Sequence, residues 1–239
     1  MQECREACGG KGYLSENRLG QLKADTEIFT TFEGDNTVLM QLVSKSIMSN
    51  FSKEFHDDGF VAVLRMLGNQ FSTLVMEQNP FTKRKSDAKY LLSGHFQLAA
   101  FRYREQKLLY SVSSRMRGLI KSKMNSTDAF LRCQTHLLEL SNAYIERIIL
   151  EQYIQQTKAV KDPATKAMLK QLGQLYALHT IESHKDFYLE SEYMSPTKTK
   201  AVRRMVDKLC KETRHQAIAL VDAFAIPDAI LQAPIALTK

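Results

Sequence analysis

Two short motifs near the start of the sequence contain residue types that could do chemistry or hold a ligand. The first is the glycine-rich segment Cys8–Tyr13, CGGKGY. Glycines there would let backbone amides approach a phosphate or a neighbouring chain, although such glycines more often only cap a helix. The second is Thr30–Thr37, TTFEGDNT, which carries the carboxylate of Glu33 next to a glycine.

The second motif lies just before a predicted helix, which we expect to start near Asn36. Unpaired N–H groups and the dipole at a helix N-terminus favour an anion at that place. The alternative is that Glu33 is an exposed loop glutamate and that Asp35-Asn36 is only an N-cap. Spacing alone favours this alternative.

Other candidate sites are weaker. Glu212 and His215 have the spacing of half a carboxylate-bridged di-iron site, but such a site needs a second pair and the sequence offers none. A surface pair is therefore the favoured interpretation, and no metal site is predicted. The cysteines lack metal-finger spacing and fit a reducing compartment.

Composition points to a compact helical protein. The chain has 239 residues, 44% of them hydrophobic, with only 10 glycines and 5 prolines. No apolar run has the length of a membrane span or the character of a signal peptide, so we expect a soluble intracellular protein. The net charge of +7 could suit nucleic acid, with Lys83–Lys85 and Arg203-Arg204 as its best residues, but a solvated helical surface is favoured.

The hydrophobic pattern predicts helices along almost the whole chain. Residues 1–8 read as the end of a helix, and 9–35 as an irregular connection. A helix follows from Asn36, and the pattern is interrupted at Asp57–Gly59. The apolar pattern resumes over Phe60–Leu74 and predicts a second helix, which ends at Asn79-Pro80. We place a domain boundary at Thr82–Asp87.

Four further helices are expected. The first runs over residues 87–124, and the next from the cap at 125–128 to about Val160. Two more begin at Asp162-Pro163 and Ser195-Pro196, because a capping residue followed by proline is typical of a helix start. The last one should end at Ile226–Asp228. The predicted fold class is all-α, with long antiparallel helices in a bundle.

A family resemblance gives these motifs a meaning. The stretch Glu3–Lys45 closely resembles acyl-CoA oxidases, where a GGxGY/F segment is followed at a fixed interval by an aromatic-Glu-Gly triplet. In this sequence Gly9–Tyr13 and Phe32–Gly34 stand at that interval without a gap. Asp222–Ala236 also looks like an oxidase C-terminus. The resemblance thus covers the whole chain and is strongest over residues 3–45.

The resemblance implies two helical domains. Residues 1–80 would be the end of the FAD-binding helical domain with its catalytic loop, and 87–239 a second, C-terminal helical domain. Family members also have an N-terminal helical domain, a β-barrel and the first helices of the flavin-binding bundle, which this sequence does not include. We therefore expect a fragment that is inactive alone and that pairs with itself or with a chain carrying the other domains.

The resemblance also implies the roles of individual residues. Glu33 matches the base that removes the α-proton of a fatty acyl-CoA thioester while the β-hydrogen leaves as hydride to FAD. The Gly34 backbone would lie along the substrate. Asp35, Asn36 and Thr37 would touch FAD. Glu6–Gly10, including Gly9 and Gly10, would reach FAD from a neighbouring subunit.

The resemblance also indicates oxygen as the electron acceptor, and the sequence leaves alternatives for the function and the compartment. Asp35-Asn36 after Glu33-Gly34, and Ala24 before Asp25, resemble oxidases, which reduce oxygen to hydrogen peroxide, more than dehydrogenases that use an electron-transfer flavoprotein. A non-catalytic helical interaction module is the main alternative. The C-terminal residues 236–239 are not a Ser-Lys-Leu peroxisomal address, so we expect a cytoplasmic setting, with the peroxisome as the alternative.

Overall fold

The structure is a computed structural model that describes residues 1–56 and 84–237, with residues 51–56 as helix backbone. Every regular element within these ranges is a helix, which confirms the predicted all-α class. The chain divides into two compact units. We call Met1–Leu39 with His215–Lys239 the terminal unit, and Met40–Arg214 the bundle unit.

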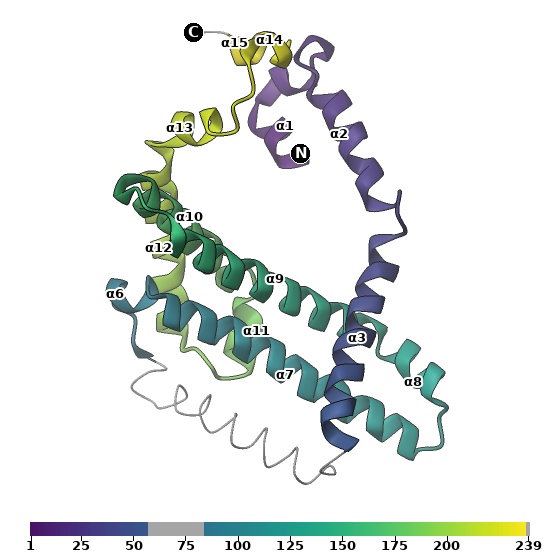
Figure 1. Cartoon of the computed structure of the whole chain (residues 1–239). Coiled ribbons are helices and arrows are strands. Elements are labelled where there is room, and N and C mark those ends of the chain that lie inside the picture. Colours follow the sequence, from purple (N-terminus) through teal and green to yellow (C-terminus); the bar gives the residue numbers. More distant parts are fainter. Residues whose placement is uncertain (57–83, 238–239) are drawn as a thin grey trace. The chain divides into compact units, whose positions relative to one another are not determined.

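The terminal unit is made of short helices from both ends of the chain (Figure 1). Its elements are α1 (Gln2–Ala7), the 3-10 turns η1 (Gly9–Tyr13), η2 (Ser15–Asn17) and η3 (Ile28–Thr30), α2 (Leu19–Glu27), the start of α3 (Asn36–His56), α13 (Ala217–Asp222), α14 (Asp228–Leu231) and α15 (Pro234–Leu237). Within this unit α2 packs against α1 and the η turns, and α15 against η2. The two chain ends therefore fold together here.

The prediction that residues 9–35 form an irregular connection was wrong. The segment contains the nine-residue helix α2 and three 3-10 turns. The nine residues of α2 include few apolar side chains, and none of them is buried. The sequence therefore shows no clear apolar periodicity from which this helix could be predicted. An i,i+4 ion pair supports it instead, with Lys23 Nζ 2.9 Å from Glu27 Oε1.

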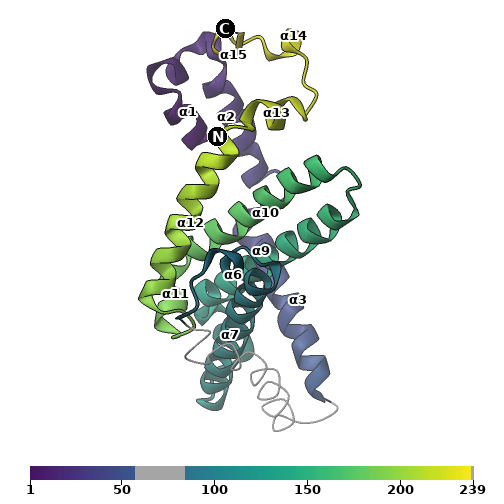
Figure 2. The same ribbon diagram turned by 90° about the vertical axis from the view of Figure 1, so that its left-hand side faces the viewer.

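The bundle unit contains the long helices (Figures 1 and 2). They are the rest of α3, then α6 (Ala88–Leu91), α7 (Gly94–Lys121), α8 (Ser126–Arg132), α9 (Gln134–Ala159), α10 (Pro163–Ser183), α11 (Lys185–Glu190) and α12 (Pro196–Arg214). The α7 helix packs along α9, and α10 packs against both α9 and α12. Residues 160–162 join α9 to α10 directly, whereas the short helices α8 and α11 lie in the connections from α7 to α9 and from α10 to α12.

Three predicted helix starts are confirmed by their caps. Asn125 accepts a hydrogen bond from the Asp128 amide at 2.9 Å. Asp162 accepts one from the Thr165 amide at 2.7 Å, and Ser195 one from the Lys198 amide at 3.2 Å. These caps satisfy amides that would otherwise lack a partner in the first helical turn.

Other boundaries differ from the predictions. The helix expected over 87–124 is split, because the Ser93 side chain accepts from the Phe96 amide at 3.3 Å and starts a new helix at Gly94. The helix expected up to Val160 is interrupted at Cys133. The last long helix ends at Arg214 rather than near Ile226, and short helices follow it. The predictions for residues 57–80 lie outside the described residues, as do Thr82 and Lys83 of the predicted Thr82–Asp87 boundary.

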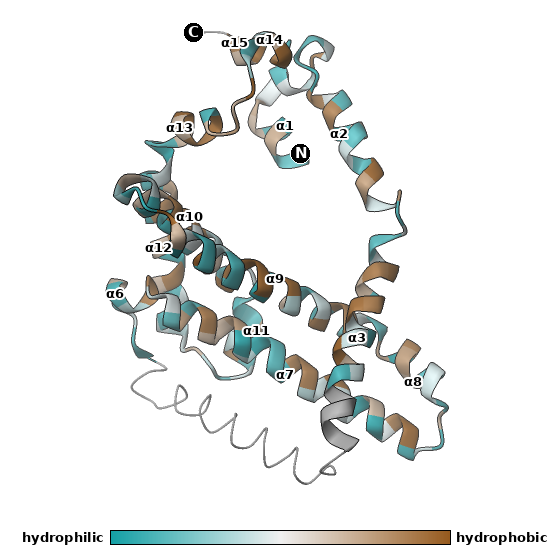
Figure 3. Ribbon diagram, viewed as in Figure 1, coloured by the Kyte–Doolittle hydropathy of each residue, from teal (hydrophilic) through white to brown (hydrophobic). Residues whose placement is uncertain are grey.

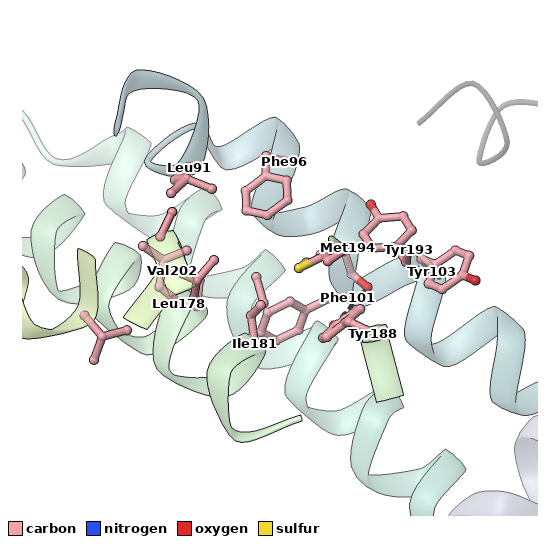
Figure 4. Packing of buried hydrophobic residues seen from close by; sticks show 14 of the residues in the cluster. Leu91, Phe96, Phe101, Tyr103, Leu178, Ile181, Tyr188, Tyr193, Met194 and Val202 are labelled. Atoms are coloured by element: carbon pink, nitrogen blue, oxygen red, sulfur yellow. Dashed lines mark hydrogen bonds between the residues drawn. The ribbon is translucent and has the colours of Figure 1, made fainter. Parts of the chain in front are cut away.

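The main core lies between α7, α10, α11 and α12 (Figure 4). Tyr103 and Tyr193 stack with ring centroids 4.1 Å apart. The buried Tyr188 hydroxyl donates to the Ala100 carbonyl at 3.1 Å, and burial raises the pKa of this tyrosine. Apolar residues of α7, α10, α11 and α12 thus meet in this packed cluster.

A second, smaller core joins α7 to α9 and holds α3 in the bundle unit. Val112, Leu137 and Leu140 are fully buried there, and Ile47 and Met48 of α3 pack against them. The Ser141 hydroxyl of α9 also donates to the Met40 carbonyl at 2.7 Å. This contact fixes α3 from Met40 onward, directly after the segment that carries Glu33.

Candidate active-site loop and glycine turn

The Glu33 loop is a tight turn between η3 and α3. The Phe32 amide donates to the Ile28 carbonyl at 3.0 Å, and the Gly34 amide to the Thr31 carbonyl at 3.0 Å. Gly34 has φ +121°, a conformation that side chains rarely adopt. This turn therefore requires glycine after Glu33, and it places the Glu33 carboxylate in an exposed position.

The residues after the turn cap the N-terminus of α3. Asp35 Oδ1 accepts from the Thr37 amide at 2.8 Å, and the Asp35 carbonyl accepts from the Leu39 amide at 3.0 Å. The capping residue is thus Asp35, and α3 begins at Asn36, where the sequence predicted a helix start. Within the described ranges, no hydrogen bond uses the amides of Asn36 and Val38, so these two donors are available to a ligand.

The glycines of the first motif have three different roles. Gly9 has φ +58° and directly follows the end of α1, as a capping glycine does. A Cβ atom on Gly12 would lie 2.1 Å from the Arg5 carbonyl oxygen, so a close backbone approach requires glycine there. Gly10 has open space around it, and its backbone is exposed. Gly9 and Gly10 are therefore the accessible part of the motif.

A buried asparagine holds the glycine turn, and the sequence analysis missed it. Asn17 is only 3% exposed. Its side chain donates to the Lys11 carbonyl at 2.9 Å and accepts from the Ile235 amide at 2.9 Å. The Arg5 guanidinium also lies over the Tyr13 ring, 4.6 Å from its centroid. No local sequence signal marks Asn17, because one of its partners is 218 residues away.

The first motif precedes α2 and the second follows it. In the part of the chain that the structure describes, no hydrogen bond or ion pair joins Glu6, Gly9 or Gly10 to the Glu33 loop. Glu6 is exposed and accepts a hydrogen bond from Gln2 on its own helix. The two predicted groups of site residues thus belong to one unit but do not contact each other through these interactions.

Three apolar residues that precede Glu33 in the chain have exposed side chains. Ile28 is 57% exposed, Phe29 66% and Phe32 58%. The rings of Phe29 and Phe32 meet edge to face, with centroids 5.4 Å apart. Figure 3 shows the first turns of α3 and most of α13 as hydrophobic segments. Among the described residues, all buried hydrophobic side chains belong to the bundle unit.

The weaker candidate sites gain no support from the geometry. Lys208 Nζ lies 3.7 Å from Glu212 Oε1, and both side chains are exposed. No group of three His, Cys, Asp or Glu side chains within residues 1–56 and 84–237 is arranged to hold a metal ion. In the same ranges, no helix combines the length and the apolar character needed to cross a membrane.

The fold and the two motifs define the class of protein. A helical bundle that follows a glycine turn and an aromatic-Glu-Gly turn is what the resemblance to acyl-CoA oxidases predicted. Residues 94–238 match the model of the family described as Acyl-CoA oxidase, and residues 1–48 match that of the Acyl-CoA oxidase, C-alpha1 domain. The first match alone spans more than half of the chain. The chain therefore belongs to the acyl-CoA oxidase family.

Individual relatives agree with this assignment. The chain is 39% identical over 237 residues to "Acyl-coenzyme A oxidase 2, peroxisomal" of Arabidopsis thaliana, covering 99% of this chain and 34% of the relative. It is 30% identical to "Acyl-coenzyme A oxidase-like protein" of Mus musculus, of which it covers 37%. The crystal structure of acyl-CoA oxidase 1 from Yarrowia lipolytica matches with a TM-score of 0.80 and 26% identity, over 98% of this chain and 33% of that one. The chain thus spans about a third of the length of these relatives.

Proposed function

We propose that this chain supplies the catalytic base of an acyl-CoA oxidase, which forms the α,β-double bond of a fatty acyl-CoA during β-oxidation. The observation that carries the proposal is the Glu33-Gly34 turn. A glycine-dependent backbone conformation exposes the side chain of Glu33 in a turn that directly follows the exposed residues Phe29 and Phe32. The turn also lies within the residues that match the family.

In this proposal Glu33 removes the α-proton of the thioester onto a carboxylate oxygen. An acyl chain lying over Phe29 and Phe32 would exclude water from the carboxylate. A carboxylate that has lost its hydration is a stronger base than one in water. The backbone of Gly34, which has no side chain to block the approach, would lie along the substrate.

The residues present fit part of an FAD site. The free amides of Asn36 and Val38 at the start of a 21-residue helix could bind anionic or acceptor atoms of the cofactor. The side chains of Asn36 and Thr37 are exposed beside them, whereas the Asp35 carboxylate already holds the Thr37 amide. When bound, FAD would supply the acceptor for the β-hydrogen as hydride, and oxygen would be the final electron acceptor, giving hydrogen peroxide.

The glycine turn is proposed as a second contact to the cofactor. The backbone of Gly9 and Gly10 is exposed and has open space around it. Glu6, which is also exposed, lies on α1 three residues before Gly9. Because no described interaction joins this turn to the Glu33 loop, we propose that it serves the site of a neighbouring subunit. The enzyme would then be a dimer, or an assembly with a chain that carries the other domains.

The domain division is also part of the proposal. The family matches cover 1–48 and 94–238, which supports a FAD-binding portion over 1–80 and a second helical domain over 87–239. The compact units divide the chain differently, because the C-terminal residues fold with the N-terminal ones. The name of the Arabidopsis relative favours the peroxisome over the cytoplasm that we expected from the sequence.

The experiment that tests the function is a complementation assay. The chain is co-expressed with the N-terminal two thirds of an acyl-CoA oxidase relative, and peroxide release from a fatty acyl-CoA is measured. We expect acyl-CoA-dependent peroxide from the pair and none from either part. Reduction of an electron-transfer flavoprotein without peroxide would instead identify a dehydrogenase.

A specific observation also favours the non-catalytic alternative, a helical interaction module. Ile218 and Val221 lie three residues apart on α13 and are 80% and 68% exposed, and Phe224, in the turn after the helix, is 77% exposed, so these side chains form an apolar surface. Such a face needs a partner. Size-exclusion chromatography with light scattering tests this, because a strictly monomeric chain would exclude self-association through this face.

A further inference from the structure

The bundle unit contains a cavity of about 310 Å³ at the end where α7 begins, α9 ends and α10 begins. Its walls come from all three helices. The lining residues are Leu92, Gly94, Gln97, Tyr153, Ile154, Thr157, Lys158, Lys166, Lys170, Gly173 and Gln174. Small-molecule sites in proteins measure roughly 300–1,000 Å³, so this cavity is large enough for a small ligand.

The polar side chains of the inner wall are already paired with backbone groups. The Tyr153 hydroxyl donates to the Leu169 carbonyl at 2.9 Å. The amides of Gln97 and Gln174 donate to the carbonyls of Leu91 and Leu92, at 3.0 and 2.7 Å. These hydrogen bonds leave mostly carbon atoms facing the cavity, which therefore suits an apolar group.

Glycine shapes this wall at Gly173. A Cβ atom there would lie 2.8 Å from Cε1 of Tyr153. The glycine therefore lets the tyrosine ring lie flat against α10, where its hydroxyl reaches Leu169. The Tyr153 ring is thus held by its packing against Gly173 and by the hydrogen bond of its hydroxyl.

Positive charge gathers at the same cavity. Lys158, Lys166 and Lys170 line it, and no acidic residue does. In the described part of the chain, no carboxylate forms an ion pair with any of the three. Lys166 donates one hydrogen bond to the Lys158 carbonyl at 2.7 Å, which holds its ammonium group at the cavity and leaves two further N–H donors.

We propose that this cavity binds a small amphipathic anion, namely an aliphatic chain with a carboxylate head. The apolar wall would take the chain, and the ammonium groups of Lys166 and Lys170 would take the head. A charged donor and a charged acceptor form stronger hydrogen bonds than neutral groups do. A free inorganic anion would leave the apolar wall unused, and a neutral chain would leave the lysines unused.

The proposal is tested by calorimetric titration of the 239-residue chain with octanoate. The matched probes are octanamide, which keeps the chain but has no charge, and inorganic phosphate, which has charge but no chain. We expect one octanoate site with a Kd below about 1 mM. Octanamide and phosphate should each bind at least roughly tenfold more weakly, since each lacks one half of the recognition.

Variants locate the site. The double variant Lys166→Gln/Lys170→Gln should weaken octanoate roughly tenfold, whereas the exposed pair Lys200→Gln/Lys211→Gln on α12 should bind like the parent chain. The δ-methyl NMR signal of Ile154, assigned by its loss in Ile154→Val, should shift on titration. No octanoate binding, equal binding by either probe or by both lysine pairs, or an unmoved Ile154 signal would each overturn the proposal.

Discussion

His184 Nε2 lies 3.3 Å from Glu146 Oε1, and this contact joins the start of α11 to the middle of α9. The other oxygen of Glu146 accepts a hydrogen bond from Arg104 of α7, whose side chain is only 4% exposed. Glu139 lies 3.5 Å from the same guanidinium. One carboxylate thus links three helices of the bundle unit, and it keeps a buried positive charge compensated.

Replacing Glu146 by alanine should destabilise the bundle unit by about 3 kcal/mol, because it leaves the buried Arg104 without its main partner. Urea unfolding followed by circular dichroism measures this change. The control is Glu190→Ala, an exposed glutamate of α11, which should change the free energy of unfolding by less than about 0.5 kcal/mol. Equal effects of the two changes would show that Glu146 is not a structural link.

The same site predicts a pH dependence. Burial alone would raise the pKa of Glu146, but the hydrogen bond from His184 and the charge of Arg104 outweigh it and lower the pKa below its usual value of 4.5. A lowered folded-state pKa contributes stability that is present above pH 4.5 and is lost as the pH falls through the folded-state value. Tyr176, which donates to the Glu146 backbone carbonyl at 3.4 Å, stays neutral throughout this range.

Comparing the chain with Glu146→Gln isolates this contribution. The difference in unfolding free energy between the two proteins should be largest near neutral pH and should shrink as the pH falls below about 4.5. Urea midpoints from pH 7 to pH 3 provide the measurement. A difference that stays constant over this range would mean that the Glu146 charge contributes nothing to stability.

Local signals explain which parts of the fold could be predicted. The caps at Asp162 and Ser195 precede proline, so sequence alone located the starts of α10 and α12. The break at Ser93 lacked such a signal, because a serine followed by glycine inside an apolar pattern can also continue a helix. The α2 helix was missed because its nine residues include few apolar side chains and show no clear hydrophobic period.

Long-range contacts explain what could not be predicted. Arg104 and Glu146 are 42 residues apart and His184 a further 38, so no local pattern marks their cluster. The same holds for Asn17 and its partner Ile235. For the candidate site, motif spacing identified the Glu33 turn, but only the backbone shows that Gly34 needs a positive φ.

Gly12→Ala should loosen the glycine turn, whereas Gly10→Ala should not. The added Cβ at position 12 would lie 2.1 Å from the Arg5 carbonyl oxygen, which forces the backbone to move, while open space surrounds Gly10. We expect overpacking to cost about 2 kcal/mol of local stability. Tryptic cleavage after Lys11 should be faster in Gly12→Ala than in the parent chain or Gly10→Ala. Equal cleavage rates in all three would show that the close approach is absent in solution.

Glu33→Gln should abolish peroxide formation in the complemented enzyme while FAD remains bound. The amide keeps the size of the side chain but cannot accept the α-proton, and loss of a general base typically costs 10²–10⁴-fold or more in rate. Peroxide release and the flavin absorbance are measured on the same preparation. Glu27→Gln, an exposed glutamate at the end of α2, is the matched control and should retain activity. Near-normal turnover by Glu33→Gln would remove this residue from the mechanism.

The 239-residue chain alone should purify without bound flavin and should produce no peroxide from acyl-CoA. The amides of Asn36 and Val38 and the backbone of Gly9 and Gly10 are only part of the contacts that a flavin needs, and the described residues of the terminal unit offer the ring no buried apolar wall. A partial site must still overcome the full loss of freedom of the bound ligand. Flavin fluorescence should therefore show no saturable change at micromolar FAD, and yellow colour should return when the complementary domains are supplied. A yellow isolated chain with stoichiometric flavin would instead mean that these residues form a complete site.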